Sequence, residues 1–411
     1  MAEESKTMYA VGLDAGSRTT RVVICVLERG RLRFLGAGSV PSEGWAKSRI
    51  ADQVAVAESI RSAMAEAQAL AGVNVEAVVV GMGGQTVNGS NSRGALELGY
   101  EREIEPGDVD RVMKRAWKAR LDEDRMILQL YPQDFVVDGF AGHRNPEKML
   151  GACLAVNVHI ATVSIQEHNA LIGAVNLASV LVEETVFEPQ AACYAAVRPE
   201  DRREGIAVLD IGAESTGLVV YYGDSLQLAC SIHSANGSQI CGDSFTRDLA
   251  HAMCLSFEDA ERVKTEFGSA SPESCPDNLH VELPAPEERE PRQGSLRHVT
   301  IVLESRATDL FRLVRQQLLR IGMDRALIGG IYVCGGGAQL AEVLDVADKE
   351  LRCQARFGLP SGIRDWPEEI RTPEWTTAAG LAMYSAKIKQ KNELKRESAG
   401  WLGKVLRQTV R

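Results

Sequence analysis

The sequence predicts an α/β fold in which two related domains face each other across a cleft, and a repeated hairpin carries that prediction. Residues 8–27 read as a strand of small and β-branched residues, a turn containing glycine and a second strand. The same pattern returns at 206–222, where Asp210 and Gly212 stand 196 residues after their counterparts in the first hairpin. A repeat this long is not the roughly 20–50-residue period of a solenoid. Ligands of α/β sheets bind in the crevice between such units.

Length and composition agree with a folded protein of several domains. The chain has 411 residues, enough for two or three domains of roughly 150 residues. Its 45% apolar, 25% charged and 5% aromatic residues argue against a disordered, collagen-like or low-complexity chain. The formal net charge is −10, yet residues 387–411 hold eight Lys and Arg against two Glu. An acidic body disfavours nucleic acid as a partner, and a basic tail favours an anionic one such as a membrane leaflet.

Cysteine usage and the first residues indicate a cytosolic protein. The nine cysteines contain no C-x-x-C pair, and several lie in apolar strand-like runs, which is typical of buried thiols in a reducing compartment. The first ten residues carry no apolar segment, and no apolar run approaches the roughly 20 residues of a bilayer span. We therefore expect neither a signal peptide nor a transmembrane helix.

The first half of the chain alternates strands and helices around an insertion. A helix at 51–72 and a strand at 76–82 continue from the first hairpin as a strand–helix–strand unit. The next residues, 84–160, interrupt this alternation with strands around 93–101, a helix at 105–116, and strands at 126–137 and 151–159. The simplest account is an inserted α+β subdomain. Residues 164–182 are helix-like and lead through Val186 and Phe187 into 188–197.

The second half continues with helices, an excursion and a glycine-rich turn. Helical patterns cover 242–268 and 297–321. Between them, residues 271–296 carry five of the 14 prolines among acidic residues, which indicates an exposed excursion. A strand at 331–334 runs into three glycines and a helix, and 373–389 is the last helix of the body.

Each of the two hairpins places an Asp and a Gly at its bend, followed by hydroxyl side chains. The segments are Asp14-Ala15-Gly16-Ser17 and Asp210-Ile211-Gly212-Ala213-Glu214-Ser215-Thr216. A glycine lets backbone N–H donors approach a phosphate chain, and hydroxyls add further donors. The two aspartates, facing each other, could orient waters on a Mg²⁺ ion that bridges the phosphates. Two unrelated turns are the alternative, since Asp and Gly are common in turns, but the matched pair favours a phosphate site.

Two further features extend this candidate site. Gly335, Gly336 and Gly337 suit close packing of backbone against a nucleotide, although a tight strand-to-helix turn explains them equally well. Glu261 and Lys264 lie three residues apart on one helix face, where they would bond ribose hydroxyls and an adenine edge. A surface ion pair is the alternative for these two. The chain has no P-loop motif.

With these loops in place, the chain resembles the actin-like ATPase superfamily and, within it, the FtsA family of bacterial cell-division proteins. The resemblance runs from about Tyr9 to Arg411. Its most specific parts are the insertion at 84–161, with SRGALELGYEREIEPGDVDRVMKRA, ILQLYPQDFVVDG and NPEKMLGACLAVNVHI, and the stretch CGDSFTRDLAHAMCLSFEDAERVKTEFG. The resemblance implies an actin-like (ribonuclease H-like) fold of two domains and four subdomains, with an inserted α+β subdomain and a C-terminal amphipathic helix.

The resemblance also implies subdomain boundaries. These are subdomain 1A at 8–83, 162–204 and 365–386, the inserted subdomain 1C at 84–161, subdomain 2A at 205–237 and 326–364, subdomain 2B at 238–325, a flexible linker at 387–398 and a membrane-targeting helix at 399–411.

The resemblance implies a site for ATP and Mg²⁺, whose residues are carried over position by position. They are Asp14, Gly16, Ser17 and Arg21 in the first phosphate loop, Asp210, Gly212, Ser215 and Thr216 in the second, Gly335, Gly336 and Gly337 on the adenosine side, Glu261 and Lys264 at the nucleoside, and Gly242 near the ribose. Asp14 and Asp210 would hold Mg²⁺ through water. Glu188 would position the attacking water, and a buried Glu that caps a helix before Pro189 is an equally good interpretation.

Three positions depart from the family pattern. Arg21 replaces a usual Lys and changes the donor geometry. Gly217 stands where many relatives have Asp, and Glu214 places a carboxylate where Gly is usual, near phosphates that it would repel. We therefore expect ATP to act as a conformational and polymerisation switch, with at most weak hydrolysis.

The last residues predict a helix that lies among lipid headgroups. On a wheel of about 100° per residue, Trp401, Leu402, Val405, Leu406 and Val410 fall on one side, and Lys404, Arg407 and Arg411 on the other. One such helix binds anionic lipid weakly, and a filament multiplies that binding. A terminal helix packed on the body or on a partner is the alternative. Residues 387–398 argue against it because they resemble a soluble tether.

These features lead us to expect an ATP-binding protein that polymerises on the cytoplasmic face of the cell membrane at the division site, ties FtsZ filaments to it and recruits later cell-division proteins. By resemblance, the acidic FtsZ tail would dock on 238–325 with Arg306 as a candidate contact, and pairing with Asp309 on the same helix is the alternative. Two other functions are the alternatives. The first is a small-molecule kinase of the same superfold, which would need a substrate pocket and a dedicated general base. The second is an FtsA-like pilus-assembly adaptor, which would not be expected to end in an amphipathic basic helix.

Overall fold

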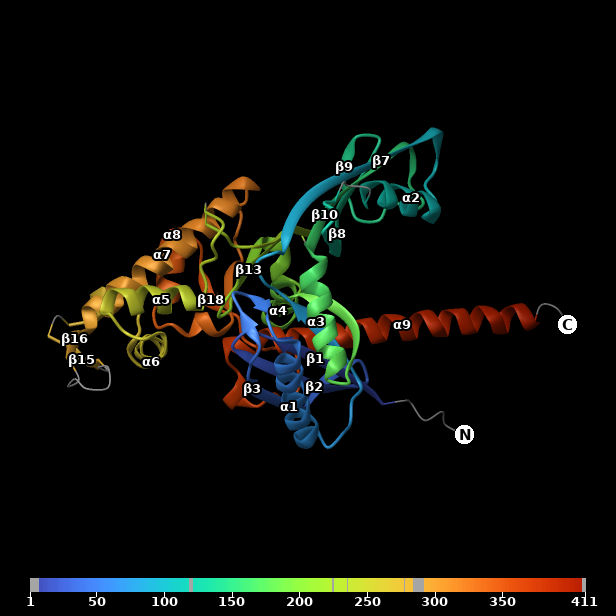
Figure 1. The fold of residues 1–411 in the computed structure, drawn as a ribbon. Coiled ribbons are helices and arrows are strands. Elements are labelled where there is room, and N and C mark those ends of the chain that lie inside the picture. Colours follow the sequence, from blue (N-terminus) through green and yellow to red (C-terminus); the bar gives the residue numbers. More distant parts are fainter. Residues whose placement is uncertain are drawn as a thin grey trace.

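The computed structural model describes residues 7–117, 121–223, 225–234, 236–276, 278–283 and 292–408, and it describes side chains up to residue 393. Two lobes, each built on a five-stranded sheet, carry one inserted subdomain and one long final helix (Figure 1).

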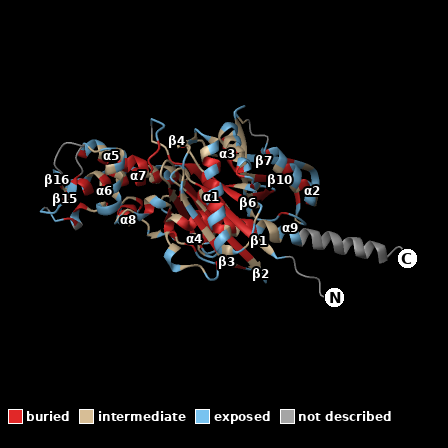
Figure 2. Cartoon of the chain, turned by 60° about the horizontal axis from the view of Figure 1, so that its bottom comes forward, coloured by how far each residue is buried: buried red, intermediate tan, exposed pale blue. Residues whose placement is uncertain are grey.

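The first lobe is a mixed sheet covered on both faces. In spatial order its strands are β11 (Leu181–Phe187), β6 (Ala77–Met82), β1 (Met8–Ala15), β2 (Thr19–Glu28) and β3 (Arg31–Pro41). Its helices are α1 (Gln53–Ala71), α3 (Ile165–Leu177), α4 (Glu188–Ala196) and α9 (Thr376–Gln408). Val11 and Leu13 join the core formed with α1, whereas Ala10 joins the core formed with α9. Burial on both faces explains why β1 is apolar throughout, and Figure 2 shows this sheet as the buried centre of the molecule.

The second lobe repeats the strand pairing of the first. Its strands are β14 (Ser225–Ser231), β13 (Thr216–Tyr222), β12 (Ile206–Ile211), β17 (Gly330–Cys334) and β18 (Ala355–Phe357). In each lobe the first strand pairs antiparallel with the next one and parallel with a later one, as β1 does with β2 and β6, and β12 with β13 and β17. The prediction of two related α/β halves is therefore confirmed.

Helices and a short hairpin complete the second lobe. They are α5 (Gly242–Met253), α6 (Phe257–Phe267), α7 (Leu296–Arg320), α8 (Val343–Leu351), β15 (His280–Leu283) and β16 (Arg292–Ser295). Short 3₁₀ turns lie at Asp201–Glu204, Pro272–Ser274, Gly336–Gln339, Glu368–Ile370 and Pro373–Trp375, and a two-residue ribbon, β4 (Trp45–Ala46) with β5 (Arg49–Ile50), lies before α1.

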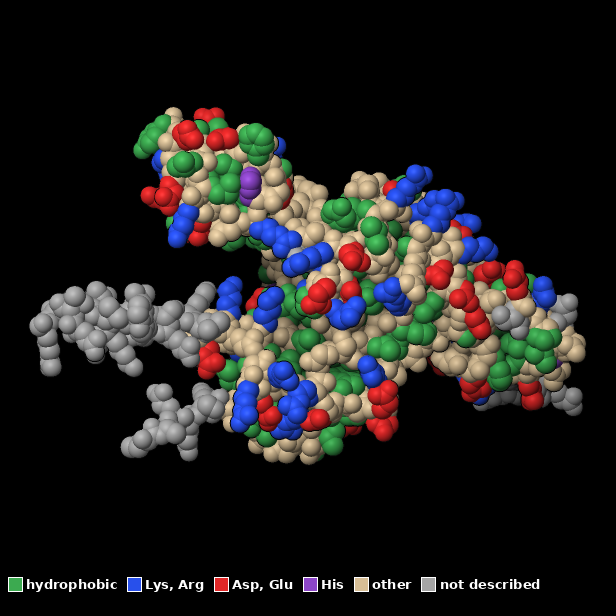
Figure 3. Space-filling model, turned by 180° about the vertical axis from the view of Figure 1, so that it is seen from behind, with side chains coloured by type: hydrophobic (Ala, Val, Ile, Leu, Met, Phe, Trp, Pro, Cys, Tyr) green, Lys and Arg blue, Asp and Glu red, His purple; other side chains and the backbone are tan. Residues whose placement is uncertain are grey.

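The insertion forms a separate subdomain with its own sheet. Its strand order is β7 (Asn88–Glu103), β10 (Leu150–Ser164), β8 (Arg125–Val137) and β9 (Phe140–His143), and α2 (Pro106–Trp117) packs on the sheet. Figure 3 shows this subdomain standing off the rest of the molecule. The expected inserted α+β subdomain is present, with β9 as a strand that the sequence pattern did not reveal.

Helix α9 packs directly against the centre of the first sheet. A Cβ atom added to Gly12 of β1 would lie 2.4 Å from the carbonyl oxygen of Ala378, and one added to Gly380 of α9 would lie 1.8 Å from that of Ala191 in α4. Glycine is required at both positions because backbone meets backbone there. The same helix then leaves the body (Figure 1).

Four sequence-based expectations differ from the structure. The predicted helix at 164–182 ends at Leu177, and strand β11 follows it. The helical region at 242–268 is two helices, broken where Cys254 takes a left-handed conformation (φ 49°). The excursion at 271–296 is not wholly exposed, because its hairpin buries Val281 and Leu283. The linker expected to be flexible at 387–398 is part of α9, since its Lys, Glu and Gln residues are strong helix formers.

Among the helices that the structure describes, none combines the length and the apolar character needed to cross a membrane.

Candidate functional site

The two lobes enclose a cleft of about 660 Å³, a volume typical of small-molecule sites. Most of the residues predicted for the site line this cleft. They are Asp14, Gly16, Ser17, Arg21, Glu188, Asp210, Gly212, Ser215, Gly242, Glu261, Lys264, Gly335, Gly336 and Gly337. The fold therefore brings together three loops and two helices that lie far apart in the sequence.

The two hairpin bends have the same local shape. A Cβ atom added to Gly16 would lie 2.8 Å from the carbonyl oxygen of Thr19, and one added to Gly212 would lie 3.0 Å from that of Ser215. The Gly212 N–H donates to that same Ser215 oxygen at 2.8 Å. Each bend is closed so tightly that a Cβ atom at its glycine would press against a backbone carbonyl, more severely at Gly16 than at Gly212.

Three carboxylates, those of Asp14, Asp210 and Glu188, gather in the cleft. Burial raises the pKa of all three, and repulsion from neighbouring carboxylates adds to the shifts of Asp14 and Glu188, while Arg21 opposes the shifts of Asp14 and Asp210. Glu188 lies close against Gly83, where a Cβ atom would be 1.9 Å from Oε2. Buried carboxylates that outnumber their cations favour a bound cation.

Arg21 has partners that a lysine could not match. It pairs with Asp14 in the register of the first hairpin, donates to Glu374 at 2.7 Å and places its guanidinium 5.6 Å from the centre of the Trp375 ring. A planar guanidinium can stack and donate at the same time, whereas an ammonium group cannot. The structure thus gives a physical reason for Arg at this position.

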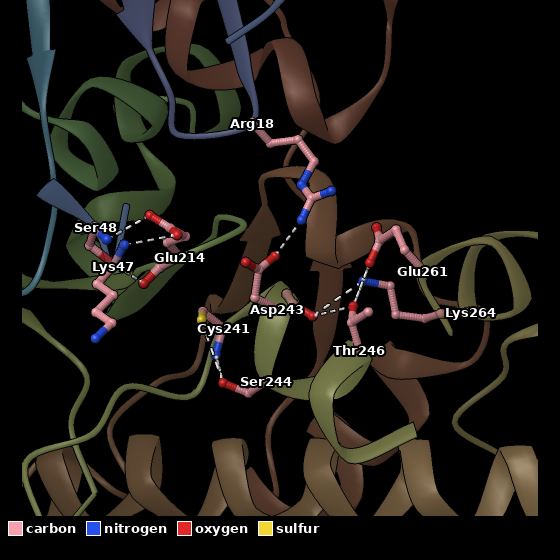
Figure 4. Close-up of polar contacts among 11 residues, drawn as sticks. Arg18, Lys47, Ser48, Glu214, Cys241, Asp243, Ser244, Thr246, Glu261 and Lys264 are labelled. Atoms are coloured by element: carbon pink, nitrogen blue, oxygen red, sulfur yellow. Dashed lines mark hydrogen bonds and ion pairs between the residues drawn. The ribbon is translucent and has the colours of Figure 1, made fainter. Parts of the chain in front are cut away.

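The other two departures also have structural reasons. A Cβ atom added to Gly217 would lie 2.5 Å from Cγ of Pro189, so the larger Asp of many relatives would not fit beside α4. Glu214, expected to repel phosphates, reaches the facing lobe instead. Its carboxylate accepts hydrogen bonds from the backbone N–H groups of Lys47 at 3.2 Å and Ser48 at 2.5 Å (Figure 4).

Glu261 and Lys264 form an ion pair that is part of the cleft wall. Lys264 Nζ donates to Glu261 at 2.7 Å, to Thr246 Oγ1 at 2.8 Å and to the Gly242 carbonyl at 3.2 Å (Figure 4). Burial acts to raise the pKa of Glu261, but hydrogen bonds from Lys264 and Thr246 outweigh it and hold that pKa below its ordinary value. The ion pair that was the alternative interpretation is therefore present, and it lines the cleft, while its contact with a nucleoside stays a prediction.

The loop of Gly335, Gly336 and Gly337 requires glycine at its first position. Gly335 has a positive φ of 80°, and a Cβ atom there would lie 2.4 Å from Oδ1 of Asp210. The loop thus packs against the carboxylate of the second hairpin. This contact explains the first of the three glycines by close approach rather than by turn geometry alone.

Three groups of predicted residues lie elsewhere. Thr216 is fully buried and donates its hydroxyl to the Ile240 carbonyl at 2.7 Å, so it does not face the cleft as predicted. Arg306 lies on α7, where it contacts Asp248 at 2.5 Å and Asp309 at 3.8 Å. The side chains of the predicted membrane helix, Trp401 to Arg411, lie outside the described residues.

Sequence reasoning missed the contacts that cross the cleft. Arg18 of the first lobe donates to Asp243 of the second at 2.7 Å, as Figure 4 shows, and its guanidinium lies 5.6 Å from the centre of the Phe257 ring. Glu374 and Thr377, around the first turn of α9, also line the cleft. The only signal for Thr377 in the sequence is a pair of threonines at the start of a helix, which is too common to single out a site.

Comparisons with known proteins match this architecture. A family model described as cell division protein FtsA matches residues 207–380, and a model of the SHS2 domain inserted in FtsA matches residues 84–162. The chain is 30% identical over 407 residues to cell division protein FtsA of Borreliella burgdorferi, with 95% of this chain and 97% of that protein covered. It is 28% identical over 387 residues to FtsA of Pseudomonas aeruginosa, with 93% and 91% covered, and 27% identical over 392 residues to FtsA of Escherichia coli K12, with 93% and 92% covered.

Solved structures support the same fold. A PilM–PilN type IV pilus biogenesis complex has a TM-score of 0.66 at 18% identity, with 92% of this chain and 98% of that chain covered. MreB5 of Spiroplasma citri bound to ADP has a TM-score of 0.55 at 14% identity, with 94% and 98% covered. These likenesses concern the actin-like fold alone, whereas the sequence matches extend over nearly the whole of the cell-division relatives. The chain therefore belongs to the FtsA family and acts in bacterial cell division.

Proposed function

We propose that this chain binds Mg²⁺ and ATP in the cleft between its lobes and uses the bound nucleotide to control its assembly on the membrane. The observation that carries this proposal is the convergence of two matched Asp-Gly bends, a triple-glycine loop and the Glu261–Lys264 pair on one cleft. Glycine backbone suits phosphate, and the polar helix pair suits a nucleoside. A solved relative of the same fold is described as bound to ADP.

The carboxylates of the cleft fit a divalent cation held through water. Asp14 and Asp210 face it from opposite hairpins, and both have raised pKa values that a cation would lower. When bound, Mg²⁺ would neutralise part of the charge of the phosphate chain. Glu188 is the candidate to hold a proton or a water near the phosphates, and burial together with the charges of Asp14 and Asp210 raises its pKa well above the ordinary value.

Calorimetry on the purified chain tests the nucleotide proposal. We expect ATP to bind in the presence of Mg²⁺, and we expect the replacement of Asp14 by Asn to weaken that binding. Asp110→Asn on α2 of the inserted subdomain is a matched control, because it makes the same change outside the cleft. Absence of magnesium-dependent nucleotide binding to the unmodified chain would overturn the proposal.

We propose further that the chain forms filaments. The inserted subdomain, which projects from the rest of the molecule (Figure 3), displays the exposed apolar side chains of Tyr100 (69% exposed), Phe140 (74%) and Leu150 (65%). Scattered apolar residues are ordinary on a surface, but three on one small subdomain favour a contact with another copy. Sedimentation of the Phe140→Ser variant beside the unmodified chain tests this, and equal pelleting would contradict it.

For the FtsZ tail we propose the face of the second lobe around α7. Arg306 keeps 27% of its side chain exposed while it pairs with Asp248, so an acidic peptide would compete with that carboxylate. We expect Arg306→Ala to weaken binding of an FtsZ C-terminal peptide and Arg61→Ala on α1 to leave it unchanged. Other cell-division proteins would bind elsewhere on the assembled filament.

The C-terminal residues are proposed to hold the protein on the cytoplasmic face of the membrane at the division site. Their alternating apolar and basic residues carry this proposal. Co-sedimentation with vesicles rich in anionic lipid, for the full chain and for a chain ending at Ser398, with and without ATP, tests it. Equal pelleting of the two chains would end the membrane-anchor proposal.

A further inference from the structure

The beginning of α9 lies inside the cleft and touches both hairpins. Thr377 Oγ1 donates to Oδ2 of Asp210 at 2.6 Å, and Glu374 accepts from Arg21 at 2.7 Å. The Pro373 carbonyl accepts from the N–H of Gly335 at 3.0 Å. One short segment therefore contacts the carboxylate of the second hairpin, the cation of the first and the triple-glycine loop.

Packing fixes this segment in place. The α9 backbone meets β1 at Gly12, two residues before Asp14, where a Cβ atom would lie 2.4 Å from the Ala378 carbonyl. The neighbouring Thr376 is fully buried and donates to the Gly358 carbonyl at 2.6 Å. Thr377 itself is only 4% exposed. Its hydroxyl therefore has a fixed position relative to both sheets.

The hydrogen bond determines which oxygen of Asp210 is available to a ligand. A threonine hydroxyl has one hydrogen, and here it points to Oδ2. Oδ1 faces Gly335, in which the missing side chain leaves room beside it.

We propose that Thr377 is a positioning residue for the metal, which orients Asp210 so that its carboxylate can hold the water shell of Mg²⁺. The inference rests on the proposed binding of ATP with Mg²⁺. It predicts a role in the magnesium-dependent part of binding, because Thr377 acts on the carboxylate and not on the base or ribose.

Nucleotide titrations in Mg²⁺ and in EDTA test this inference. For each variant we compare the ATP dissociation constant in EDTA divided by the ATP dissociation constant in Mg²⁺, which measures how much magnesium strengthens binding. We expect Thr377→Val to reduce this ratio about tenfold, the effect of losing one hydrogen bond to a charged group. Thr377→Ser keeps the hydroxyl and is expected to keep the ratio within about twofold of the unmodified chain.

Thr376→Val provides the matched control, since it removes an equally buried hydroxyl that faces away from the carboxylates. We expect it to lower the melting temperature without changing the ratio. The inference would be overturned if Thr377→Val kept the ratio of the unmodified chain, or if Thr376→Val lowered the ratio as much as Thr377→Val does. If the unmodified chain binds no nucleotide under either condition, the proposed function fails instead, so the two failures are distinguishable.

Discussion

At the scale of single residues, the cleft holds three buried carboxylates whose charged forms are unfavourable in the absence of a ligand. Asp14, Asp210 and Glu188 all have raised pKa values, because burial disfavours their charged forms and, for Asp14 and Glu188, repulsion from neighbouring carboxylates adds to that effect. Arg21 is the neighbour that opposes the shifts of the first two. These buried carboxylates are therefore expected to reduce the stability of the protein without a ligand, as groups placed for function commonly do.

The pH dependence of stability follows from the sign of these shifts. Burial raises the pKa of Asp14 to about 7. The folded protein then holds this proton more tightly than the unfolded chain, so stability is lost as pH rises from about 4 to about 7. We expect Asp14→Asn to be more stable than the unmodified protein at pH 7.5, with the difference disappearing near pH 4. Urea unfolding without nucleotide at several pH values measures this.

The control for this prediction is Asp52→Asn. Asp52 caps α1 by accepting from the N–H groups of Val54 and Ala55, and Asn caps helices about as well as Asp. We expect its effect on stability to be small. A pH-independent gain in Asp14→Asn would show that packing, and not charge, limits stability at this position.

Glu214 makes a second residue-scale prediction, because it ties the lobes together. Its carboxylate accepts from two backbone N–H groups of the facing lobe, and its own carbonyl accepts from Ser48 Oγ at 2.5 Å. Glu214→Ala removes the two carboxylate bonds and keeps the third. We expect hydrogen exchange at Lys47 and Ser48 to accelerate about tenfold or more, since hydrogen bonds to charged groups contribute about 1.5–3 kcal/mol. Glu58→Ala, which removes an exposed pair within α1, is expected to leave that exchange unchanged.

At the scale of elements, the sequence predicted those helices and strands that have a clear local pattern and missed those that do not. Both hairpins were predictable because each strand is apolar and each bend carries its own Asp and Gly. Strand β11 was missed because Glu183 and Glu184 interrupt the apolar pattern at the edge of the sheet. The break at Cys254 has no glycine to mark it.

In the candidate site, too, the sequence predicted the features with a local motif and missed the contacts between distant residues. Loops with a local Asp-Gly signature were found from sequence, and they line one cleft. Arg18 and Asp243 are 225 residues apart, and nothing near either residue indicates the other. Thr377 likewise acquires its partner only because the beginning of α9 lies at the cleft between the two lobes. Contacts between lobes depend on the complete fold, which single-sequence patterns do not contain.

The close packing of α9 gives a prediction at the element scale. Gly380→Ala would force a methyl group into the Ala191 carbonyl, and overpacking of this kind typically costs about 1–3 kcal/mol or more. We expect chemical denaturation to show a loss of at least that size. Gly107→Ala in the first turn of α2 meets no atom within 4 Å and is expected to be neutral or slightly stabilising. Equal effects of the two substitutions would contradict direct backbone contact between α9 and α4.

At the scale of the whole molecule, the inserted subdomain rests on the second lobe although it branches from the first. Ser225 Oγ of β14 donates to the Gln133 carbonyl at 2.6 Å, and the N–H of Ser231 donates to the Val87 carbonyl at 3.1 Å. The N–H of Ala229 donates to Nε2 of His159 at 2.9 Å. A change in the angle between the lobes must therefore move or break the contacts of the subdomain with β14.

His159 makes this connection sensitive to pH. Its Nδ1–H donates to Asn91 Oδ1 at 2.7 Å, so Nε2 is the acceptor for Ala229, and burial lowers the pKa of the imidazole to about 4. The unfolded chain takes up this proton near pH 6.5 and the folded protein does not, so stability present above pH 6.5 is lost as pH falls towards 4.

We expect exchange of the Ala229 amide to accelerate below about pH 5, and His159→Gln to lose less stability on acidification than the unmodified protein. His143→Gln in the same subdomain serves as the control, and an acid response of Ala229 that persists unchanged in His159→Gln would refute this role of His159.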